Sequence, residues 1–264
     1  MTKAKIIATG GLSRSGTNYC NYFFFLHPRI KPIGYLSQYD LEKWRELFGP
    51  MDIEFIHKKW TKTIKPAPTP FFKELRWDDS LGPEFEKFHQ FQNEKQEFDA
   101  ICFKADFGEN WFHRLLPKQK DRALVIYCIR DPIKIYQSWK KWGRYKNKRI
   151  AKQWFEAFEN TINDSYLYLR YSENGLLDFM PIYLGHSHEE IFRRLTYALN
   201  HYVGMDLGDL QAKFMEKRRP LVTNLGLCDI TQSEDELLKE ILEVGPDFEE
   251  LKEKYLGLAD LVSF

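Results

Sequence analysis

Short apolar runs recur along the chain with the length and composition of buried β-strands. The clearest is ALVIYCI at residues 123–129, a continuous β-branched and apolar run typical of a parallel strand that is covered on both faces. Shorter runs at residues 5–9, 98–104 and 179–184 predict three further strands.

Between these runs, apolar positions recur roughly every three to four residues, which predicts amphipathic helices. These helices are expected at residues 17–26, 84–97, 133–142, 150–171 and 187–203, with another near the C-terminus. Asp131 and Pro132 offer an N-cap and a first-turn proline to the helix at 133–142. The S-x-x-E spacing of a capping box predicts helix starts at Ser187 and Ser233.

Alternation of strands and helices predicts parallel strands joined by right-handed crossovers. The expected fold class is therefore α/β, a three-layer α/β/α P-loop fold with a central parallel sheet. We expect one domain over residues 1–264, since no linker divides the chain. Residues 31–70 are irregular, with prolines at 66, 68 and 70, and we interpret residues 31–97 as an insertion or a substrate-side lid. Residues 205–264 are expected to form a C-terminal loop and helices.

The amino-acid composition restricts the classes of partner that this protein is expected to bind. The 39 Lys and Arg residues nearly balance 38 Asp and Glu residues, so bulk charge does not favour nucleic acid or anionic lipid, and any anion site must be local. No apolar run approaches the about 20 residues of a membrane span, and no signal-peptide pattern opens the chain, so we expect a cytoplasmic protein without membrane contact. The four cysteines are spread without a C-x-x-C pair, which favours reduced thiols.

The segment GGLSRSGTN at residues 10–18 lies between a predicted strand and a predicted helix, the setting in which backbone N–H groups hold a phosphate. Gly11 and Gly16 keep the spacing of the nucleoside-triphosphate loop, but Thr17 replaces its Lys and Asn18 replaces its magnesium-binding hydroxyl. An ordinary ATPase or GTPase is therefore disfavoured. Arg14 carries the positive charge inside the loop instead, which suits a single 5′-phosphate.

The motif SRSGT, followed by an apolar helix and His27-Pro28, resembles the 5′-phosphosulfate loop of sulfotransferases that use 3′-phosphoadenosine 5′-phosphosulfate (PAPS), especially the bacterial and tyrosylprotein types. The resemblance implies transfer of a sulfuryl group from PAPS to an acceptor hydroxyl or amine, with 3′-phosphoadenosine 5′-phosphate (PAP) as product. The donor-binding residues that it implies in this loop are Ser13, Arg14, Ser15, Gly16, Thr17 and Asn18.

A second motif, Arg130-Asp131-Pro132 with Ser138 eight residues after the arginine, is similar to the 3′-phosphate site of the same family. The resemblance implies that Arg130 and Ser138 clamp the 3′-phosphate of the donor. The placement is physically sensible, because Arg130 follows the predicted strand 123–129 and open α/β sheets bind ligands at the carboxyl ends of their strands.

Lys104-Ala105-Asp106 ends the predicted strand at 98–104. In the family a lysine at this place contacts the bridging oxygen of the phosphosulfate, and in cytosolic members a nearby histidine is the general base. The resemblance therefore assigns Arg14, Lys104 and Asp106 to catalysis, with Asp106 in place of that histidine. An ordinary carboxylate, with a pKa of about 4, is a weak base unless its surroundings raise that pKa.

Other family features differ in this chain. Leu184 stands where a glutamate is usual, and the family's late R-K-G-x-x-G motif is absent, although Arg218 and Arg219 lie where relatives bring a basic segment over the nucleotide. No metal site is expected, because the histidines lack ligand spacing. The acceptor, a small molecule or a glycan, and the oligomeric state are left open. Two alternatives also stay open: a magnesium-dependent P-loop kinase, and a non-catalytic nucleotide- or glycan-binding module.

Overall fold

The structure is a computed structural model that describes residues 3–25, 27, 29–33, 99–106, 122–141, 150–208 and 232–261. Its strands are β1 (Ile6–Gly11), β2 (Ile30–Ile33), β3 (Ala100–Asp106), β4 (Ala123–Ile129) and β5 (Asp178–Tyr183). Its α-helices are α1 (Thr17–Phe25), α7 (Pro132–Lys141), α8 (Ile150–Glu173), α9 (His188–Ala198), α12 (Glu234–Leu242) and α13 (Phe248–Gly257). A π-helical turn, η2 (Leu199–Val203), continues α9, and a short 3-10 turn, η3 (Leu258–Asp260), follows α13.

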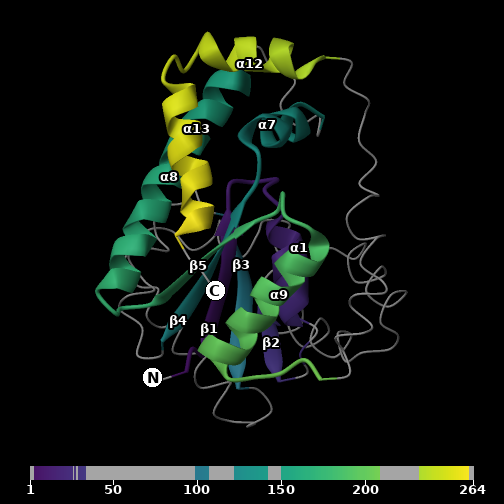
Figure 1. Cartoon of the computed structure of the whole chain (residues 1–264), viewed down its shortest axis with the longest axis vertical. Coiled ribbons are helices and arrows are strands. Elements are labelled where there is room, and N and C mark those ends of the chain that lie inside the picture. Colours follow the sequence, from purple (N-terminus) through teal and green to yellow (C-terminus); the bar gives the residue numbers. More distant parts are fainter. Residues whose placement is uncertain are drawn as a thin grey trace, which may run out of the picture.

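The described strands form one parallel sheet in the order β2-β3-β1-β4-β5 (Figure 1). Strand β1 lies in the middle, so the loop that follows it opens at the centre of the sheet edge. Thr9 of β1 is paired with Lys104 of β3 on one side and with Ile126 of β4 on the other. All five carboxyl ends therefore point toward the same edge.

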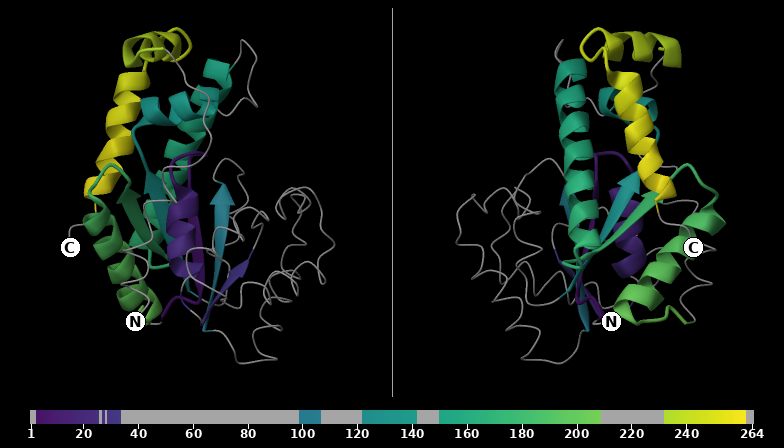
Figure 2. Two further views of the ribbon diagram at one scale, coloured as in Figure 1. Left: turned by 90° about the vertical axis from the view of Figure 1, so that its right-hand side faces the viewer. Right: turned by 60° about the vertical axis from the view of Figure 1, so that its left-hand side comes forward.

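Helices cover both faces of the sheet (Figure 2), and the side chains of β4 show why. Leu124, Ile126 and Cys128 belong to a core shared with α1, α9 and η2. Val125 and Tyr127 belong to a second core shared with α7, α8, α12 and α13. Because successive side chains of a strand point to opposite faces, a continuous apolar run supplies both cores.

The C-terminal helix α13 is attached to α8 through aromatic packing. The rings of Trp154 and Phe158 stack at 5.2 Å, and Phe158 also contacts Phe248 and Tyr255 of α13. All four side chains are fully buried. Burying each such ring contributes about 1.5–3 kcal/mol, so this cluster fixes α13 firmly against the sheet.

The three-layer α/β/α fold predicted from the sequence is confirmed. Strand β4 occupies the predicted residues, and α7 begins at Pro132 with the Asp131 carboxylate accepting a hydrogen bond from the N–H of Lys134 at 3.1 Å. At Ser233 both hydrogen bonds of the predicted capping box form with Glu236. None of the described helices has the length and apolar character needed to cross a bilayer.

One prediction needs correction, and one is confirmed in part. Residues 31–33, expected to be irregular, belong to strand β2, which pairs with β3 and tolerates Pro32 at the edge of the sheet. The predicted helix start at Ser187 is confirmed, since Ser187 is the N-cap of α9, but only half of the capping box forms. The Ser187 hydroxyl accepts the N–H of Glu190, but the Glu190 carboxylate binds Arg193 and Arg194 instead of reaching back. The predicted helix at 84–97 and most of the proposed lid lie outside the described residues.

Candidate anion site at the carboxyl edge of the sheet

The loop between β1 and α1 crosses the carboxyl edge of the sheet at close range. Gly11 and Gly16 have φ angles of +141° and +97°, which L side chains rarely adopt. A Cβ at Gly11 would overlap the carbonyl oxygen of Cys128, and one at Gly16 would overlap the side chain of Leu184. Both glycines are therefore required for the loop to lie against the ends of β4 and β5.

Arg14, between these glycines, has a φ of +77° and is the only non-glycine with positive φ among the described residues. A left-handed conformation of this kind costs an ordinary residue about 1–2 kcal/mol. Two hydrogen bonds hold the backbone in place. The carbonyl of Ser13 accepts the indole N–H of Trp139 at 2.8 Å, and that of Arg14 accepts the guanidinium of Arg130 at 3.2 Å.

The side chain of Arg14 points to the second motif. Its Nε donates to Ser138 Oγ at 3.0 Å, although the two residues are 124 positions apart in the sequence. Arg130 reaches the same loop from the end of β4. Arg14, Arg130 and Ser138, predicted from two separate motifs, are thus brought together by the fold.

Both guanidinium groups are partly buried and close to each other. Burial lowers the pKa of Arg14, and the positive charge of Arg130 lowers it further. Burial also lowers the pKa of Arg130, an effect that the neighbouring Asp131 offsets in part. Two crowded cations are less favourable than separated ones, so an anion between them is electrostatically favoured.

The loop also offers uncharged donors. The Ser15 hydroxyl is buried and has no hydrogen-bond partner among the described residues, while its backbone N–H donates to the carbonyl of Leu12 at 2.9 Å. Thr17 opens α1, whose first turn carries no acidic side chain. The first N–H groups of a helix lack intrahelical partners and attract anions, so the start of α1 and the Ser15 hydroxyl fit a phosphate-like group.

The described backbone places Lys104 and Asp106 beside this loop. Lys104 is paired with Thr9, and Asp106 with Gly11, at the carboxyl end of β3. The structure describes the backbone but not the side chains of Lys104, Asp106 and Asn18, so their contacts stay predictions. Arg218 and Arg219 lie outside the described residues.

Sequence reasoning missed two residues that shape the loop, Trp139 and Leu184. Trp139 fits the apolar face of an amphipathic helix, so the pattern alone assigns it to the core; its position next to Ser138 was the available signal. Leu184 was noted only for replacing a glutamate. It packs against Gly16 and donates its backbone N–H to the carbonyl of Ile129 at 2.8 Å.

Helix α7, which carries Ser138 and Trp139, is held from above by α12. The Glu240 carboxylate accepts hydrogen bonds from the Tyr136 hydroxyl at 2.7 Å, from Lys140 at 2.6 Å and from Gln232 at 2.8 Å. In β4, the strand before α7, the carbonyl of Cys128 accepts a hydrogen bond from the Tyr255 hydroxyl of α13 at 3.4 Å. The C-terminal helices thus brace both elements of the second motif.

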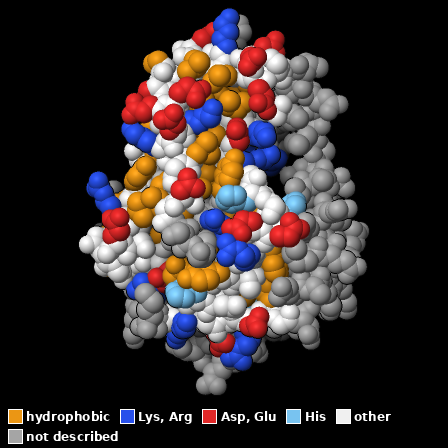
Figure 3. Space-filling view, in the orientation of Figure 1, with side chains coloured by type: hydrophobic (Ala, Val, Ile, Leu, Met, Phe, Trp, Pro, Cys, Tyr) orange, Lys and Arg blue, Asp and Glu red, His pale blue; other side chains and the backbone are white. Residues whose placement is uncertain are grey.

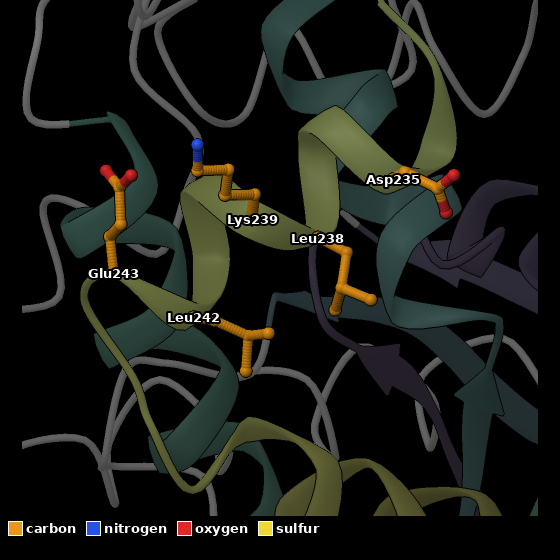
Figure 4. Close-up of a pocket in the computed structure, with 5 residues that line it drawn as sticks. All are labelled: Asp235, Leu238, Lys239, Leu242 and Glu243. Atoms are coloured by element: carbon orange, nitrogen blue, oxygen red, sulfur yellow. The ribbon is translucent and has the colours of Figure 1, made fainter.

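A separate shallow cavity of about 370 Å³ lies on α12 (Figure 4) and is lined by Asp235, Leu238, Lys239, Leu242 and Glu243. No residue of the two motifs lines it. On the face shown in Figure 3, acidic and basic side chains alternate among hydrophobic ones over α8, α12 and α13. The cavity lining holds two carboxylates and one lysine, so it does not concentrate positive charge as the Arg14 and Arg130 pair does.

Comparison with solved structures supports the fold. The chain is similar to the sulfotransferase STF9 from Mycobacterium avium, with a TM-score of 0.51 and 12% identity over 94% of this chain and 76% of that chain. The sulfotransferase domain of the olefin synthase from Synechococcus PCC 7002 gives a TM-score of 0.44 and 14% identity, over 100% of this chain and 90% of that chain. No protein-family model and no curated protein sequence matches the chain.

The chain has the α/β fold of a sulfotransferase. The resemblance first seen in two short motifs is confirmed at the level of the fold. At 12% identity the likeness to the Mycobacterium avium protein concerns the fold alone, so donor and acceptor must be argued from the site itself.

Proposed function

We infer that the protein is a PAPS-dependent sulfotransferase that transfers a sulfuryl group to a hydroxyl or amine of a small molecule or glycan. One observation carries the proposal: Arg14 of the phosphate loop meets Ser138 and Arg130, the second motif, at a single edge of the sheet. The two phosphate-binding motifs meet at Arg14, whose backbone is in the left-handed conformation. This arrangement suits a nucleotide that carries phosphates on both the 3′ and the 5′ oxygen of its ribose.

Each motif is assigned one end of the donor. Residues 13–18 would hold the 5′-phosphosulfate through loop N–H groups, the Ser15 hydroxyl and the start of α1. Arg130 and Ser138 would hold the 3′-phosphate. Arg14 connects the two, since its backbone belongs to the loop and its side chain touches Ser138. Arg218 and Arg219 are proposed to add positive charge over the bound nucleotide.

In the proposed reaction, the acceptor oxygen or nitrogen forms a bond to sulfur while the bond from sulfur to the 5′-phosphate oxygen breaks. The leaving PAP gains negative charge, and the acceptor loses a proton. Arg14 and Lys104 would stabilise that charge, and Asp106 is the candidate base for the proton. As in phosphoryl transfer, catalysis here is mainly positioning and electrostatic stabilisation.

Calorimetric titration with PAP, adenosine 5′-phosphate and ATP with magnesium tests the donor. We expect PAP to bind most tightly, because it alone engages both motifs. Tight binding of ATP with magnesium and none of PAP would instead identify a kinase-like enzyme and overturn the proposal.

Transfer of labelled sulfate from PAPS to a panel of phenols, sugars and amines tests catalysis. Arg14→Ala and Lys104→Ala should each lower kcat about 10²- to 10³-fold, the usual loss when one stabilising donor is removed. Lys134→Ala is the charge-matched control, since Lys134 is exposed on the same helix as Ser138. If the protein binds PAP but transfers sulfate to no acceptor, the result contradicts an enzymatic role and favours a non-catalytic nucleotide-binding module.

A further inference from the structure

The indole of Trp139 contacts the phosphate loop from its buried side. Trp139 lies on α7 directly after Ser138, its side chain is 7% exposed, and its Nε1–H donates to the carbonyl of Ser13 at 2.8 Å. An uncharged N–H of this kind adds nothing to the positive charge of the site. Its expected effect is therefore on the backbone conformation of the loop.

The conformation in question is that of Arg14. Its φ of +77° is unfavourable for a residue with a Cβ, and such conformations persist where the surrounding structure over-determines them. Two successive loop carbonyls, those of Ser13 and Arg14, are held by Trp139 of α7, next to the second motif, and by Arg130 of that motif. The peptide planes on both sides of Arg14 are thereby fixed.

The two donors differ in what an incoming anion does to them. Arg130 is a partly buried cation, so a phosphate competes with the Arg14 carbonyl for its N–H groups. The Trp139 N–H is a single donor, already engaged and buried on the core side. Trp139 is therefore the donor that can hold the loop both with and without a bound nucleotide.

We propose that Trp139 is a positioning residue of the phosphate loop, which keeps Arg14 in its left-handed conformation and aims the Arg14 guanidinium toward Ser138. The identity of the ligand rests on the proposed function, whereas the effect on the loop does not. A neutral hydrogen bond of ordinary strength changes a local equilibrium roughly 3- to 10-fold, which sets the size of effect to expect.

The chain contains a matched control. Trp154 is also a buried tryptophan of the same core, and its Nε1 has no hydrogen-bond partner among the described residues. Trp139→Phe and Trp154→Phe thus remove the same N–H from two buried rings, but only the first removes a bond to the loop. Measured melting temperatures are used to check that both variants fold. If the Trp139→Phe protein cannot be purified in folded form, Trp139→Met takes its place.

Amide hydrogen exchange of residues 12–16 in the ligand-free protein is the first measurement. Trp139→Phe should speed exchange in this segment roughly 3- to 10-fold, and Trp154→Phe should leave it unchanged. Equal exchange in the two variants would overturn the proposal. This comparison needs no nucleotide, so it stands even if the proposed function fails.

Nucleotide affinity is the second measurement, with adenosine 5′-phosphate and adenosine 3′-phosphate as probes. Trp139→Phe should weaken the 5′-phosphate roughly 3- to 10-fold and the 3′-phosphate by less than about 2-fold, because the loop is assigned the 5′ end. Equal losses for both probes would indicate a general packing defect and contradict a positioning role. If the wild-type protein binds neither these probes nor PAP, the proposed function fails and the exchange data alone decide the role of Trp139.

Discussion

Arg122 and Arg130 flank the same strand, β4, and their surroundings are opposite. At the amino end, Arg122 forms a two-pronged salt bridge with Asp178 of β5, with both N–O distances 2.7 Å, and this hydrogen bonding raises the pKa of Arg122. At the carboxyl end, Arg130 meets the loop of a second arginine, and burial lowers its pKa. A cation matched by a carboxylate stabilises the fold, whereas a cation beside another cation creates an anion site.

The largest expected effect is on nucleotide affinity. Arg130→Ala should weaken PAP binding about 100-fold, because a charged donor to a phosphate is lost from a partly buried site. Arg122→Ala should leave the affinity unchanged, since its charge is already matched by Asp178 at the far end of the strand. Calorimetric titration of both variants checks this, and similar losses would abolish the distinction between the two arginines.

The next largest effect is on the free energy of unfolding, where Arg122→Ala is expected to cost more than Arg130→Ala. The Asp178 side chain is only 7% exposed, so Arg122→Ala leaves a nearly unpaired buried carboxylate. We expect a loss of about 2 kcal/mol in the free energy of unfolding, between the values for exposed and buried pairs. Arg130→Ala removes a crowded cation and should change stability little or raise it. Urea unfolding of both variants measures the difference, and a larger loss for Arg130→Ala would contradict it.

The smallest effect is a pH dependence at the amino edge. Burial lowers the pKa of His27, whose Nδ1 accepts the N–H of Arg29 at 3.2 Å. Because the folded-state pKa lies below the unfolded value of about 6.5, the unfolded chain binds more protons, and stability is lost as the pH falls below about 6.5. His27→Gln should flatten this dependence in unfolding curves between about pH 7 and pH 5. An unchanged slope would show that His27 does not titrate with folding.

The sequence by itself determined the elements whose pattern is local. Strand β4 follows from seven consecutive apolar residues, the start of α7 from Asp131 and Pro132, and the loop between β1 and α1 from the spacing of Gly11 and Gly16. Short-range sterics, capping and burial fix such features within a few residues. The resemblance of two short motifs to those of sulfotransferases allowed Arg14, Arg130 and Ser138 to be named as candidates from the sequence.

Only the tertiary structure decided what depends on distant partners. The four residues of β2 become a strand because β3 offers an edge, and Glu190 leaves its capping box because Arg193 and Arg194 compete for its carboxylate. The indole N–H of Trp139 donates to the carbonyl of Ser13, although the two residues are 126 positions apart in the sequence. Hydrogen bonds and strand pairs of this range arise from packing, so no local pattern of hydrophobic and polar residues encodes them.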